Sequence, residues 1–219
     1  YIDIFNIEKY INFLDKNLII YGESGIGKYS FVLNLIKCKS PTELKYDKKM
    51  VVNFNKNDFY FKISDVHYEI DISLLGCNSK LLWHELYNHI VDSVLSKKQG
   101  LIYIVLKNFN KINNELLDIF YTYMQSDMNN LTTIKFIIIT ESICFLPDNI
   151  FTRCKLITLD KPSKTNYAKI LEYKLDKNSD IENLRNIKDQ KKDSFKINNL
   201  NKLENLDMYS KIVNEIINL

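Results

Sequence analysis

The stretch LIIYGESGIGKYS, residues 18–30, carries most of the fold information in this chain. Residues 18–21 form a short apolar run that stops at a glycine, as a buried strand does. Residues 22–28 fit the pattern GxxxxGK, in which glycines let successive backbone N–H groups turn inward around an anion. A helical apolar stripe follows, through Phe31, Val32, Leu35 and Ile36. Strand, glycine loop and helix in this order predict a phosphate-binding loop, and the alternative is an ordinary glycine-rich turn before a helix.

The residue after the loop lysine departs from the usual pattern. Tyr29 follows Lys28 at the position where a Ser or Thr that binds magnesium usually lies. The nearest hydroxyl belongs to Ser30, and one residue along a helix rotates a side chain by about 100°. The residues predicted to contact a nucleotide are Gly22, Glu23, Ser24, Gly25, Ile26, Gly27, Lys28, Tyr29 and Ser30.

The acidic residues of a hydrolysing site are also missing where they are expected. An enzyme of this type needs an acidic pair after a later strand. The strand LIYIVL, residues 101–106, is followed by Lys107 and Asn108, and a lysine at the magnesium position would repel the ion. The strand FIIIT, residues 136–140, is followed by Glu141, which leaves the choice of strand open. We predict that the chain binds ATP weakly or without Mg²⁺, or binds it without hydrolysing it, and we assign no metal ligand.

The order of apolar segments predicts an α/β fold of the P-loop NTPase class, with a parallel sheet flanked by helices. We expect further strands at 68–72, 101–106, 136–140 and 156–159, a hairpin within 50–64, and helices at 28–37, 80–95, 114–125 and 163–175. Residues 1–175 form the predicted nucleotide-binding domain. Residues 176–219 are expected to be a polar linker and a short helical C-terminal extension at 203–219.

Composition narrows the class of protein. With 46% hydrophobic residues the 219-residue chain can bury a sizeable core, and a formal charge of +3 permits nucleic-acid contact without arguing for it. The four cysteines do not pair as CxxC or cluster with histidines, which indicates reduced thiols inside a cell and no zinc site. No apolar run approaches the ~20 residues that cross a membrane. We therefore expect an intracellular, non-secreted protein with no membrane contact.

Three further stretches carry a family resemblance together with Lys28-Tyr29-Ser30. They are Val66-His67-Tyr68-Glu69-Ile70 leading through Gly76-Cys77-Asn78-Ser79 to Glu85-Leu86, then Lys107-Asn108, and then Thr152-Arg153-Cys154 after a Pro-containing loop. They resemble the aromatic-plus-HLE segment, the DE box and the Ser-Arg-Cys box of the replication factor C small subunits, clamp loaders of the AAA+ family. The likeness is greatest to the subunit whose own ATP site is degenerate, and it covers residues 1–175.

The resemblance implies a subunit that assists ATP-driven loading of a sliding clamp onto primed DNA. The implied partners are other clamp-loader subunits, the sliding clamp and primer–template DNA, in a nucleus or a viral replication compartment. The family's box arginine acts as an arginine finger in the neighbouring subunit's ATP site, so Arg153, one of only two arginines, is the implied catalytic residue. The family's lid and collar are not recognisable after residue 175, which implies a truncated, divergent or differently assembled chain.

Two other functions stay open. The chain could be an active P-loop ATPase or nucleotide kinase with Glu141 as its acid. It could also be a stand-alone binding protein that kept the fold and lost the partners. An exposed loop arginine without a catalytic role is the alternative for Arg153.

Overall fold

The computed structural model describes residues 7–54, 57–96, 100–125 and 133–161, together with Ser163 and Asn166. The chain divides into two compact units, one of residues 1–23 and 27–161 and the other of residues 24–26 and 162–219. Every helix and strand named below belongs to the first unit.

The strands of the described residues form one sheet in the order β2-β3-β4-β5-β6-β1-β7. Neighbours from β4 through β7 pair in parallel, whereas β2 with β3 and β3 with β4 pair antiparallel. The strands are β1 (Asn17–Tyr21), β2 (Lys48–Phe54), β3 (Asn57–Ile63), β4 (His67–Asp71), β5 (Leu101–Lys107), β6 (Thr133–Thr140) and β7 (Cys154–Thr158). The predicted α/β class, with a mostly parallel sheet and one hairpin, is confirmed.

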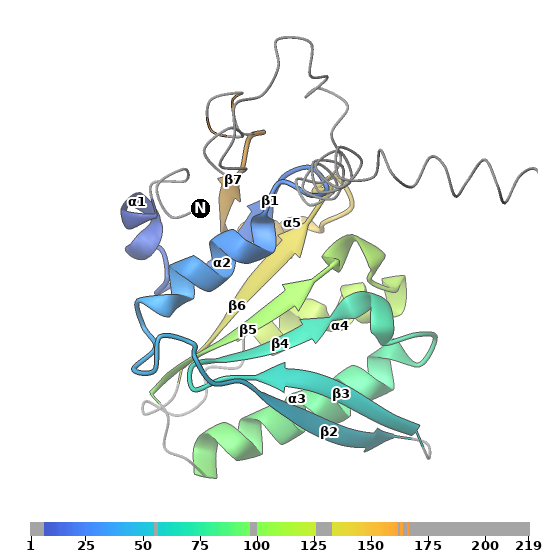
Figure 1. Cartoon of the computed structure of the whole chain (residues 1–219). Coiled ribbons are helices and arrows are strands. Elements are labelled where there is room, and N and C mark those ends of the chain that lie inside the picture. Colours follow the sequence, from blue (N-terminus) through green and yellow to red (C-terminus); the bar gives the residue numbers. More distant parts are fainter. Residues whose placement is uncertain are drawn as a thin grey trace, which may run out of the picture. The chain divides into compact units, whose positions relative to one another are not determined.

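Helices lie on both faces of this sheet (Figure 1). They are α1 (Glu8–Ile11), α2 (Lys28–Lys37), α3 (Ser79–Ser96), α4 (Asn114–Gln125) and α5 (Asp148–Phe151), with 3₁₀ turns η2 (Ile72–Leu74) and η3 (Phe109–Lys111). Successive strand residues point to opposite faces. On β5, Ile104 and Leu106 pack in the core cluster that contains the apolar stripes of α3 and α4. Val105, also fully buried, points to the opposite face, which α2 covers.

Aromatic side chains fill the core between α3, α4 and the sheet. Trp83 and Phe120 are fully buried, with ring centroids 5.2 Å apart, and Phe136 of β6 lies 5.6 Å from Phe120. Burying a side chain of this size contributes about 1.5–3 kcal/mol relative to leaving it exposed. This cluster anchors α4 and β6, and β6 is the strand that pairs with β1 and ends at Thr140.

The glycine loop follows the carboxyl end of β1, where the winding of the sheet reverses. β7 lies on one side of β1, and every other strand lies on the side of β6. Open α/β sheets bind ligands at the carboxyl ends of strands at such a switch point. The topology therefore places the loop where this fold class binds phosphates.

The predicted helices 28–37 and 114–125 have the observed bounds of α2 and α4. The strand predictions differ at their ends: β4 begins one residue earlier, at His67, and β6 begins three residues earlier, at Thr133. β7 begins at Cys154 and ends at Thr158, one residue before the predicted end.

The predicted C-terminal elements lie outside the described residues. This holds for the helix at 163–175, the linker after 176, the helix at 203–219 and the domain boundary at 175. Ser163 and Asn166 are described, and the Asn166 amide donates to Ser163 Oγ at 3.4 Å, the contact expected of a helix-capping serine. The domain prediction otherwise stays a prediction.

Candidate nucleotide-binding site

The glycine loop uses backbone conformations that only glycine adopts readily. Gly25 has φ 78° and Gly27 has φ 94°. Gly27 caps α2 and has no side chain to accept from the first amides of the helix. The N–H groups of a helix start then remain available to an anion, and the helix dipole favours negative charge there.

Lys28 is folded back onto this loop. Its ammonium donates to the carbonyl oxygen of Gly22 at 2.8 Å and to that of Glu23 at 2.6 Å. Glu141 Oε1 lies 3.6 Å away, and the Lys28 side chain is only 8% exposed. Burial lowers the pKa of Lys28, although the charges of Glu141 and Glu23 oppose the shift. An incoming phosphate would meet an ammonium that is already paired with a carboxylate.

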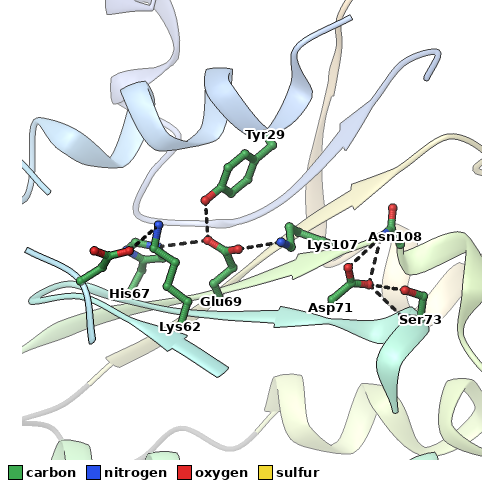
Figure 2. Close-up of polar contacts among 9 residues, drawn as sticks. Tyr29, Lys62, His67, Glu69, Asp71, Ser73, Lys107 and Asn108 are labelled. Carbon is green, nitrogen blue, oxygen red and sulfur yellow. Dashed lines mark hydrogen bonds and ion pairs between the residues drawn. The ribbon is translucent and has the colours of Figure 1, made fainter. Parts of the chain in front are cut away.

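Tyr29 turns toward the sheet and takes part in a partly buried polar cluster (Figure 2). Its hydroxyl donates to Glu69 Oε2 at 2.6 Å, and Lys107 Nζ lies 2.7 Å from Glu69 Oε1. The same ammonium stands 5.2 Å from the centroid of the Tyr29 ring. His67 Nε2 lies 3.9 Å from Glu69 Oε2. We call these residues the Tyr29–Glu69–Lys107 cluster; it ties the first turn of α2 to β4 and β5.

The charge state of the cluster follows from its contacts. Burial by itself would raise the pKa of Glu69, but its contacts with His67, Lys107 and Tyr29, with the charge of Lys107, lower it to about 2. Burial and the Glu69 carboxylate raise the pKa of the Tyr29 phenol. At neutral pH Glu69 is therefore an ionised carboxylate and Tyr29 a protonated phenol.

Asn108 forms a second polar contact at the same edge of the sheet. Its backbone is left-handed, with φ 53° and ψ 41°, a conformation that asparagine tolerates better than most residues. Its amide nitrogen lies 2.9 and 3.0 Å from the two carboxylate oxygens of Asp71. Asp71 also accepts from the amide and hydroxyl of Ser73 (Figure 2).

Sequence reasoning missed Glu69 and Asp71 as site residues. Their alternation in HYEID places both on one face of β4, which a period of two could have indicated. Their position beside the Lys107-Asn108 pair depends on β4 pairing with β5, with Asp71 opposite Lys107. Strand order is not visible in a local pattern.

The residues of this site do not fit a magnesium ion. Mg²⁺ needs near-octahedral oxygen ligands, and the two positions that would supply them hold Tyr29 and Lys107. The carboxylates of Glu69 and Asp71 are already engaged by donors. Among the described residues, no group of three or more His, Cys, Asp and Glu side chains is placed to hold a metal ion.

The remaining predicted loop residues lie as follows. Glu23 is exposed and pairs with Lys161 at 2.7 Å. Ser24 is exposed, and Ser30 is half-buried in the first turn of α2. Their contact with a nucleotide stays a prediction.

Arg153 lies at the opposite edge of the sheet from the loop of its own chain. It is exposed and directly precedes β7, and Cys154 pairs with Asn17, the first residue of β1. The loop follows the far end of β1, and five strand residues span roughly 16 Å. The Arg153 guanidinium lies 5.4 Å from the centroid of the Tyr121 ring. Arg153 cannot serve the phosphate loop of its own chain in this arrangement.

No protein-family model and no curated protein matches the sequence. Two solved structures have a partly similar fold. The RuvB Holliday junction branch migration motor of Thermotoga maritima is 11% identical, with TM-score 0.48, over 76% of this chain and 48% of that one. PCH-2 of C. elegans is 10% identical, with TM-score 0.49, over 76% of this chain and 45% of that one. The match thus spans about half the length of either protein. Within the described residues, no helix is long and apolar enough to cross a membrane.

Proposed function

We propose that this chain is a nucleotide-binding AAA+ subunit of a clamp loader that does not hydrolyse ATP itself. The observation that carries the proposal is the coexistence of an ordered glycine loop with a Tyr29–Glu69–Lys107 cluster where a hydrolysing site would hold its metal. The loop, Lys28 and the start of α2 can bind the phosphates of ATP. The two positions at the end of β5 hold Lys107 and Asn108 in place of carboxylates that could position Mg²⁺ or polarise water.

The catalytic contribution of the chain then lies in a neighbouring subunit. Arg153 is exposed at the edge of the sheet away from its own loop, as a residue acting in trans must be. Its guanidinium lies against the Tyr121 ring and stays at the surface. A guanidinium can contact a phosphate with two parallel N–H donors, which an ammonium cannot do.

The partners and the setting follow from the motif resemblance. The chain would assemble with other clamp-loader subunits and assist the loading of a sliding clamp onto primer–template DNA. This places it in a nucleus or a viral replication compartment, in contact with DNA through the assembly.

The decisive experiment measures steady-state ATPase of the reconstituted assembly with clamp and primed DNA. Removing an arginine finger costs ~10³-fold or more at the site it serves. Arg153→Ala should therefore remove from the ATPase rate of the assembly the part contributed by the one site that Arg153 serves. Arg153→Lys should not restore that part fully. Lys155→Ala, at an exposed basic residue of β7 two positions after Arg153, is the matched control and should leave the rate unchanged. An unchanged rate for Arg153→Ala in an intact assembly would remove the trans-acting role.

The alternative is an active P-loop ATPase or nucleotide kinase that uses Glu141. The observation in its favour is that Glu141 lies beside the loop, 3.6 Å from Lys28. Turnover by the purified chain alone separates the two functions. We expect a rate no higher than that of Lys28→Ala, and turnover that depends clearly on Lys28 would support the enzyme.

A further inference from the structure

We propose that the Lys107 ammonium takes the place of the magnesium ion, so that this site binds a nucleotide polyphosphate free of metal. The inference rests on the proposed nucleotide binding at the glycine loop. To that function it adds Lys107 as a residue that binds the nucleotide, and it identifies the ligand as a polyphosphate without bound metal. The evidence is the geometry of the Tyr29–Glu69–Lys107 cluster (Figure 2).

The cluster lies next to the phosphate-binding elements. Tyr29 directly follows Lys28 in the first turn of α2, and its ring lies 5.2 Å from Lys107 Nζ. Lys107 is the last residue of β5, so its side chain starts at the carboxyl edge of the sheet. The cation of Lys107 is thus held beside the ring of Tyr29, the second residue of the helix that Gly27 leaves without a side-chain cap.

Lys107 retains the capacity to bind an anion. An ammonium has three N–H donors, and Glu69 Oε1 engages it at 2.7 Å. Its side chain is 30% exposed, whereas that of Glu69 is only 6% exposed. A lysine stem is flexible, so the ammonium can contact a phosphate oxygen while it stays near Glu69.

A divalent cation has no place in the same volume. It would lie beside the positive charge of Lys107, and it would compete for Glu69 with Tyr29 and Lys107, each of which engages one of the two carboxylate oxygens. Asp71, the next carboxylate along β4, is engaged by Asn108 and Ser73. Mg²⁺ also keeps several of its waters and demands near-ideal octahedral geometry. One charge supplied by the protein therefore replaces two supplied by the metal.

The test compares ATP binding by calorimetry in excess EDTA and in excess Mg²⁺, at matched ionic strength. We expect the wild-type chain to bind metal-free ATP at least as tightly as MgATP. Lys107→Gln should weaken metal-free binding about tenfold or more, because a hydrogen-bonding charge is lost. Lys111→Gln, an exposed lysine in η3 just after the same strand, is the matched control and should bind as the wild type does.

A double variant tests whether magnesium-binding side chains at these two positions make ATP binding depend on Mg²⁺. Tyr29→Ser with Lys107→Asp restores a hydroxyl and a carboxylate at the two metal positions, and Mg²⁺ should then strengthen ATP binding about tenfold or more. If the wild-type chain binds MgATP about tenfold or more tightly than metal-free ATP, the proposal is overturned, although nucleotide binding itself stands. Absence of ATP binding by the wild-type chain in both conditions would refute the proposed function itself. The wild-type comparison needs no variant, so a misfolded variant does not rescue the proposal.

Discussion

Replacing Glu69 by glutamine should destabilise the fold in a way that depends on pH. The Glu69 side chain is 6% exposed, and its contacts lower its pKa from 4.5 to about 2. A shift of this size is worth on the order of 3 kcal/mol of folding free energy at neutral pH. Glutamine keeps an acceptor for the Tyr29 hydroxyl but leaves Lys107 without a counter-charge. We expect Glu69→Gln to cost about 2–3 kcal/mol at pH 7.

The sign of the pH dependence follows from the lowered pKa. A carboxyl group that is more acidic in the folded chain stabilises the fold fully above its unfolded pKa, here 4.5, and loses that effect as the pH falls through about 2. At pH 3 the contribution of Glu69 should have fallen to about 1.4 kcal/mol. The gap in stability between wild type and variant should therefore narrow to less than half.

Urea unfolding of both chains at pH 7, 5 and 3 measures this gap. Glu85→Gln, on the exposed side of α3, is the control and should change stability by less than about 0.5 kcal/mol at any of these pH values. A Glu69→Gln cost that stays constant from pH 7 to pH 3 would refute the reasoning. A cost below about 1 kcal/mol at pH 7 would do the same.

Three further changes test other parts of the fold and site. Glu141→Gln removes the carboxylate that pairs with Lys28 at 3.6 Å, so ATP should bind about two- to fivefold more tightly in calorimetry; unchanged affinity with lost turnover would favour the enzyme alternative. Asn108→Ala should destabilise the chain by about 1–2 kcal/mol in urea, and Asn108→Gly by less, because glycine relieves the left-handed backbone although both lose the contact with Asp71. Equal losses of unfolding free energy for the two variants would show that the left-handed backbone at position 108 does not affect stability. Phe120→Ala opens a cavity in the aromatic core and should cost about 3–5 kcal/mol in the same assay, and a cost under 1 kcal/mol would place Phe120 outside the core.

The local elements could be predicted because their physical causes lie within a few residues. The apolar spacing of 28–37 and 114–125 matches the helical repeat, and both helices have the predicted bounds. Strand ends were less accurate because pairing with a neighbour extends a strand past its apolar run: β6 begins at Thr133, which pairs with Leu101. The glycine loop was recognisable because positive φ restricts the choice of residue.

The composition of the site could not be predicted in the same way. The sequence identified Tyr29 and Lys107 as departures from a magnesium site, 78 positions apart by their numbers. Their shared partner, Glu69, is identified only when β4 pairs with β5 and the Tyr29 side chain of α2 reaches β4. The same holds for Asn108 with Asp71 and for the distance of Arg153 from its own loop. Local preferences act over a few residues of chain, whereas strand order depends on how the whole apolar surface is buried, so residues far apart in sequence meet only in the folded state.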